Sequence, residues 1–139
     1  MELDDLEFER QLGNGTLPLA LFDHLGHLRL AWIYLGRYGE AAAIEKACRD
    51  IRTFASSHGD ADRFHRTLTV ASIKVVNHFV QKSQASRFED LLDEFPVLKD
   101  SFKRLLERHY SQECLNSKKA RLEYLPLDLF PFDPCPTNL

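Results

Sequence analysis

The chain has 139 residues, enough for one domain with a substantial hydrophobic core but not for two independent domains. Its formal net charge of -3 argues against a general nucleic-acid-binding protein, whose surface should be clearly basic. Cys48, Cys114 and Cys135 follow no metal-ligand spacing and make no disulfide framework. Because such cysteine usage is typical of a reducing compartment, we expect a cytoplasmic protein.

The first segment, residues 1–15, is acidic and ends in Gly13-Asn14-Gly15. This composition predicts a loosely ordered arm, in which Leu3, Leu6 and Phe8 can at most dock a short helical turn onto the body. The segment lacks the basic start and apolar run of a signal peptide. No apolar stretch of the chain is long enough to span a bilayer, so we expect no membrane partner.

Residues 16–124 show the periodicity of amphipathic helices and predict a single small bundle of about five helices. The expected helices cover, in chain order, residues 19–35, 40–57, 60–82, 87–95 and 98–110, with a last helical turn within 113–124. Asp60 is the expected N-cap of the third helix. Gly26 lies inside the first, where the absence of a side chain lets a neighbouring helix or a ligand approach closely.

The last segment, residues 125–139, contains four prolines and therefore cannot be helical. Its leucines and phenylalanines are too apolar for a free tail. We expect an extended strap that packs across the bundle or meets a partner. With no strand pattern elsewhere in the chain, the predicted fold class is all-α with irregular ends.

Three histidines are the most informative polar residues of the predicted core. His24 and His27 share one helical face, and His65 lies in a second apolar helix with Thr69 on the same stripe. Buried polar groups need partners, and neutral imidazoles bind zinc, iron, copper or nickel. Three imidazole ligands leave one coordination position open, as in catalytic zinc sites. The pattern thus predicts a divalent transition metal held by these three histidines, with Thr69 supporting them.

Three further residues are candidates for proton transfer beside such a centre. Tyr34 follows the histidine pair on its helix, and His109 precedes Tyr110 near the end of the last predicted long helix. A tyrosine with a neighbouring histidine can act as acid and base. Together with the metal they predict a small metal-dependent enzyme, or a metal-binding protein, that takes a small-molecule substrate. The competing interpretation is that all these side chains bond backbone groups or carboxylates and serve packing alone.

The two histidine elements resemble a known family. The run from His24 to Leu35 has the pattern H-x-x-H-L-x-x-A-W-x-Y-L, and the run from Phe64 to Thr69 has the pattern aromatic-H-x-T-x-T. With the segment Arg108-His109-Tyr110-Ser111, these elements are similar to a family of small bacterial all-helical proteins of uncharacterised function. The resemblance covers roughly residues 24–122 and implies that His24, His27, His65 and Thr69 act as one group. It implies no particular reaction.

Two other functions are compatible with the same residues. The chain can be a non-enzymatic helical adaptor or regulatory protein whose strap, residues 125–139, contacts a partner or a second copy in a homodimer. It can also be a metal-free protein with a pocket for a small organic acid or amine.

Overall fold

The computed structural model describes residues 3–129, and all regular elements among these residues are helical, with no strand. The prediction of an all-α fold is therefore confirmed. The helices are α1 (Asp5–Asn14), α2 (His24–Tyr38), α3 (Glu40–Ser57), α4 (Arg66–Lys82), α5 (Phe88–Glu94), α6 (Val97–Asp100), α7 (Phe102–Glu107), α8 (Gln112–Leu115) and α9 (Lys118–Leu122), with short 3-10 turns η1 (Leu19–Leu21) and η2 (Ala61–Arg63).

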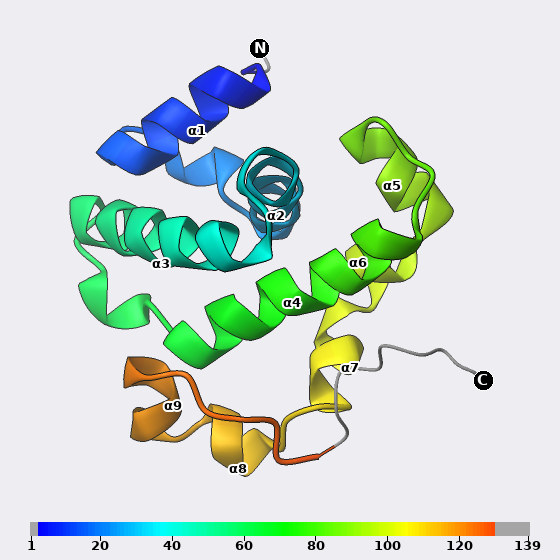
Figure 1. Ribbon diagram of the computed structural model, residues 1–139. Helices are drawn as coiled ribbons and strands as arrows, with labels where there is room; N and C mark the ends of the chain where they lie inside the picture. The colour runs from blue at the N-terminus through cyan, green and yellow to red at the C-terminus, as the bar shows by residue number, and fades with distance from the viewer. Residues whose placement is uncertain (1–2, 130–139) are drawn as a thin grey trace.

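Helices α2, α3 and α4 pack against one another and form the centre of the molecule. Figure 1 shows α1 on one side of this group and α7, α8 and α9 on the other side of α4. The main core lies between α1, α2, α3 and α4, where Leu12, Leu30 and Tyr34 are fully buried. A second, smaller cluster joins α4 to α7 and α8 around Tyr110. None of the described helices is long and apolar enough to cross a lipid bilayer.

The predicted loose arm is wrong for its described part, because residues 5–14 form helix α1. Asp4 caps this helix by accepting a hydrogen bond from the Glu7 amide at 2.8 Å, and Gly15 ends it with a φ of 79°. Phe8 and Leu12, one turn apart, are 1% and 0% exposed. These two apolar residues anchor the helix to α2 and α3, although most of its other side chains are polar.

Helix α4 begins at Arg66, six residues later than the predicted N-cap at Asp60. The N-cap is His65, whose ring nitrogen Nδ1 accepts a hydrogen bond from the Leu68 amide at 3.0 Å. Asp60 instead precedes the turn η2 and makes no side-chain cap. Because η2 and the extended residues Phe64 and His65 intervene, the backbone reaches helical geometry only after His65.

Gly26 has the close backbone contact expected from its place between the histidines. A Cβ atom at this position would lie 2.3 Å from the carbonyl oxygen of Leu21, the last residue of η1. No real Cβ tolerates that distance, so the turn η1 can lie against α2 only where a side chain is absent.

The first residues of the predicted strap follow α9 back along the bundle. The Thr67 hydroxyl donates to the Glu123 carbonyl at 2.8 Å and accepts from the Leu125 amide at 3.0 Å. The Tyr110 hydroxyl donates to the Leu125 carbonyl at 2.9 Å. Residues 130–139, the greater part of the predicted strap, lie outside the described residues.

Candidate ligand-binding site

The start of α2 positions two of the three histidines. Asp23 caps this helix by accepting a hydrogen bond from the Gly26 amide at 2.9 Å. His24 Nε2 donates to the Leu98 carbonyl at 3.0 Å and so ties α2 to α6. His27 Nδ1 donates to the Asp23 carbonyl at 2.8 Å. In each ring one nitrogen donates to a backbone carbonyl oxygen, and the other has no hydrogen-bond partner among the described residues.

His65 differs because both of its ring nitrogens have protein partners. Nδ1 caps α4, and Nε2 donates to the carbonyl of Leu115, fifty residues away in α8, at 2.8 Å. No lone pair of this imidazole remains to bind a metal ion in this conformation. His65 therefore serves to fasten α8 to the start of α4.

The predicted transition-metal centre finds no support in this arrangement. Within residues 3–129, no three His, Cys, Asp or Glu side chains are grouped in a way that could hold a metal ion. The spacing of His24 and His27 correctly places the two residues near each other on one helix. The hydrogen-bond partners of both rings, however, are backbone carbonyls.

The three histidines nevertheless contribute to the wall of one cavity of about 270 Å³. Thr69 and Ser72 of α4 add two hydroxyl groups to this wall. The Thr69 hydroxyl is engaged, since it donates to the His65 carbonyl at 2.8 Å. The remaining lining is mainly apolar and comes from α2, α3, α4, α7 and the segment around η2, including Leu28, Leu68, Ile73, Val76, Phe102 and Leu106. Among the described residues, Arg63 of η2 is the one charged residue of this lining. We call this space the histidine cavity.

A larger cleft of about 890 Å³ lies beside the histidine cavity and shares part of its wall. The shared residues are His24, His65, Leu68, Phe102 and Leu106. The rest of its lining comes from α6 to α9, and it includes four basic side chains, Lys99, Lys103, Arg104 and Arg121, against two acidic ones, Asp100 and Glu107. We call this space the basic cleft.

None of these four basic side chains has an acidic partner within residues 3–129. Lys99, Lys103 and Arg104 are exposed and form no ion pair with another described residue. Arg121 donates to the Asp62 carbonyl at 3.1 Å, which joins α9 to η2. Of the two acids, Glu107 accepts a hydrogen bond from Gln112 at 3.1 Å. The cleft is thus positively charged in a chain whose net charge is -3.

His27 is shared with a further cavity of about 420 Å³ between η1, α3 and η2. Its ring stacks on Phe22 with the centroids 3.9 Å apart, and Phe54 and Phe64 also line that space. Although His27 as a whole residue is exposed, removal of its ring from water lowers the pKa of His27 below its ordinary value. The neutral imidazole is therefore favoured at this position.

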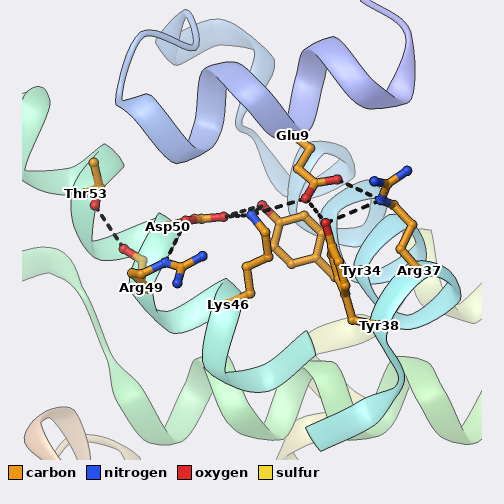
Figure 2. Close-up of polar contacts among 8 residues, drawn as sticks. All are labelled: Glu9, Tyr34, Arg37, Tyr38, Lys46, Arg49, Asp50 and Thr53. Atoms are coloured by element: carbon orange, nitrogen blue, oxygen red, sulfur yellow. Dashed lines mark hydrogen bonds and ion pairs between the residues drawn. The ribbon is translucent and has the colours of Figure 1, made fainter. Parts of the chain in front are cut away.

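Tyr34, a predicted proton-transfer residue, belongs to a separate buried group at the junction of α1, α2 and α3. Its hydroxyl donates to Asp50 Oδ2 at 2.5 Å, and Lys46 Nζ lies 2.6 Å from the same oxygen. Figure 2 shows the Lys46 ammonium between Asp50 and Glu9, 3.2 Å from a Glu9 oxygen. Glu9 also accepts from Tyr38 and pairs with Arg37 at 3.1 Å. We call these six residues the charged cluster.

The hydroxyl groups of Tyr34 and Tyr110, two of the predicted proton-transfer residues, both form hydrogen bonds within the protein. Burial and the bond to Asp50 raise the pKa of Tyr34, and burial raises the pKa of Tyr110. Tyr34 and Tyr110 are 0% and 1% exposed. His109 accepts the Leu129 amide through its backbone carbonyl at 3.0 Å. These contacts give no support to a proton-transfer role for the three residues, which stays a prediction.

The basic residues of the cleft were not singled out from the sequence. Lys99, Lys103 and Arg104 are spaced so that a helix would carry them on neighbouring turns, and this is the signal that could have been used. Arg121 joins them only through the fold.

No protein-family model, curated protein or solved structure matched the chain. The resemblance to a bacterial helical family therefore stays a prediction, and a function can be proposed only from the geometry of the site.

Proposed function

We propose that the protein binds a small organic acid, whose apolar body enters the histidine cavity and whose carboxylate stays in the basic cleft. The observation that carries this proposal is the shared wall of the two spaces: an apolar chamber adjoins a cleft whose cations have no acidic partner among the described residues. These features support a binding role more directly than the metal-dependent enzyme that the histidines alone suggested.

The size of the histidine cavity suits a small apolar group. An apolar cavity of about 150 Å³ is enough to hold benzene, and this chamber measures about 270 Å³. A phenyl ring with a short alkyl chain therefore fits its volume. Burial of such a group supplies the larger part of the binding free energy, since transfer of apolar surface from water is favourable.

The positive charge of the basic cleft favours an anionic group at the end of the ligand that stays outside the histidine cavity. Lys99, Lys103 and Arg104 have no ion pair with a described residue that must break before they bind an anion. An ammonium ligand would meet like charges at the same place, which disfavours amines. We therefore choose the acid over the amine for the occupant.

Calorimetric titration of the full chain with 3-phenylpropionate and with 3-phenylpropylamine tests this proposal. These probes have the same apolar body and opposite charge. We expect the acid to bind, the amine to bind at least tenfold more weakly, and the affinity of the acid to fall as salt is raised. Equal binding of both compounds, or stronger binding of the amine, would overturn the proposal.

A pair of charge-reversal variants locates the binding. The double variant Lys103→Glu with Arg104→Glu should weaken the acid by at least tenfold. The control variant Lys118→Glu with Lys119→Glu makes the same change in net charge on α9, at residues that do not line the cleft, and should change the affinity less than twofold. Equal losses in the two variants would mean that overall charge, and not this cleft, attracts the acid.

A further inference from the structure

We infer that the organic acid also carries a hydrogen-bond donor, such as a hydroxyl group, on the end of its apolar body, and that the unprotonated ring nitrogens of His24 and His27 accept from it. This inference rests on the proposed function and narrows the ligand class to hydroxy-substituted acids.

The tautomer of His24 leaves one of its ring nitrogens as an acceptor. Its Nε2 lies 3.0 Å from the Leu98 carbonyl oxygen, an acceptor that cannot donate, so Nε2 carries the hydrogen. In the neutral imidazole Nδ1 is then an acceptor. No described residue donates to it. His24 lines both the histidine cavity and the basic cleft, so the residue that carries this acceptor lies in the wall between the two spaces.

The same logic assigns the opposite tautomer to His27. Its Nδ1 lies 2.8 Å from the Asp23 carbonyl oxygen and must carry the hydrogen, so Nε2 is the acceptor. No described residue donates to Nε2. Desolvation of this ring favours its neutral form, which keeps that acceptor available.

Among the other polar groups of the wall, only the hydroxyl oxygens of Thr69 and Ser72 can still accept a hydrogen bond. Both nitrogens of His65 are used within the protein, and the Thr69 hydroxyl already donates its hydrogen to the His65 carbonyl. Ser72 adds one hydroxyl, which can donate or accept. Arg63, which pairs with Asp60 at 3.3 Å, adds a guanidinium donor to the same wall, and the two imidazole nitrogens are acceptors to which no described residue donates. His24 and His27 are exposed, so water can satisfy these two lone pairs when no ligand is bound. A ligand group that donates can replace this water, whereas a group that only accepts cannot.

A series of three acids on the unmodified full chain tests this inference. The compounds are 3-phenylpropionate, 3-(4-hydroxyphenyl)propionate and 3-(4-methoxyphenyl)propionate, and the measurement is calorimetric titration. A net hydrogen bond corresponds to about a fivefold change in affinity. We expect the hydroxyl compound to bind at least fivefold more tightly than the unsubstituted acid and than the methoxy compound, which can accept but not donate.

Ring-preserving variants then assign the acceptor. His24→Phe and His27→Phe keep an aromatic ring but remove the nitrogens, and at least one of them should abolish the fivefold preference for the hydroxyl compound. His58→Phe is the control, because His58 lines the cavity of about 420 Å³ beside η1 and not the histidine cavity, and this variant should keep the preference.

The outcomes separate the two proposals. If the unsubstituted acid binds but the hydroxyl compound gains nothing, the hydrogen-bond inference is overturned and the proposed function stands. If none of the three acids binds, the proposed function itself fails. Should a histidine variant not fold, the comparison of the three acids on the unmodified chain still decides the inference.

Discussion

The charged cluster is a group of polar side chains between α1, α2 and α3, whereas the histidine cavity is a mainly apolar space with a few polar side chains in its wall. The two regions use their hydrogen-bonding groups in different ways. In the charged cluster, Asp50 holds Tyr34 and Lys46, and Lys46 in turn reaches Glu9. In the histidine cavity, two rings retain an acceptor, and the cations of the adjoining cleft have no acidic partner within residues 3–129. A polar group whose hydrogen-bond and ion-pair partners all belong to the protein stabilises the fold. A polar group with an unused donor, acceptor or charge is available to a ligand.

This difference implies that substitutions in the two regions should have different consequences. In the charged cluster they should lower the free energy of unfolding with no effect on ligand binding. In the cavity and the cleft they should change binding with a smaller effect on stability. Substitutions at Asp50 of the charged cluster and at His65 and His27 of the cavity test this distinction. Gly26 lies in neither region, and its substitution tests the contact between η1 and α2. The four are taken in decreasing order of their expected effect on stability.

The largest effect on stability should come from Asp50→Ala. The Asp50 side chain is 3% exposed, and its removal leaves the buried Tyr34 hydroxyl without an acceptor and Lys46 with Glu9 alone. Breaking a buried ion pair by removing one partner costs about 3–5 kcal/mol. Urea denaturation measures this loss. The control Asp90→Ala removes an exposed partner of Arg87 and should change little. Similar small changes in both variants would show that the charged cluster does not stabilise the fold.

Gly26→Ala should be the next most harmful change. The added Cβ would meet the Leu21 carbonyl at 2.3 Å, so η1 must move away from α2. Overpacking of this kind costs about 1–3 kcal/mol. The matched control is Gly36→Ala on the same helix, where nothing lies within 4 Å and alanine should stabilise the helix. If thermal unfolding shows both variants to be stabilised, the close contact of η1 with α2 is not present in solution.

Two substitutions of His65 distinguish its two hydrogen bonds. His65→Ala removes both the cap of α4 and the bond to Leu115 and should cost about 1–2 kcal/mol. His65→Asn can still cap the helix but is too short to reach α8, so it should recover part of that loss. Denaturant midpoints of the two variants make this comparison. Identical losses would mean that the cap contributes nothing.

The smallest effect should be a pH dependence that originates at His27. Because the pKa of His27 is lower in the folded chain than its ordinary value of 6.5, the unfolded chain binds more protons as the pH falls below that value. Stability from this group is fully present above pH 6.5 and declines as the pH falls through the folded pKa. His27→Gln should flatten that part of the curve of unfolding free energy against pH. Parallel curves for the two proteins would contradict this assignment.

The sequence allowed the fold class and the approximate helices to be predicted because the apolar periodicity of residues 24–57 is strong. It did not reveal α1, since the acidic residues of the segment conceal Phe8 and Leu12, which are the two side chains that anchor it. It also misplaced the start of α4, because Asp60 is a common capping residue and histidine is not. Local preferences were overridden by contacts between distant segments.

Part of the candidate site could also be predicted from helical periodicity. Helical spacing indicated correctly that His24 and His27 lie near each other, and they line one cavity with His65 and Thr69. Spacing could not show whether these rings are free to bind a metal ion, because each ring forms a hydrogen bond with a backbone carbonyl. For His24 and His65 these carbonyls belong to Leu98 and Leu115, which are 74 and 50 residues away. The basic cleft depends in addition on α7 and α9 meeting around α4.

The most direct test of the proposed binding site is a two-dimensional NMR titration of the isotope-labelled full chain with 3-phenylpropionate. We predict that the largest shifts of backbone amide signals occur at Leu68, Phe102, Lys103 and Leu106, while those of Lys46 and Asp50 in the charged cluster do not move. Shifts that concentrate on α1 and the charged cluster, or no shifts at millimolar acid, would contradict the proposed site.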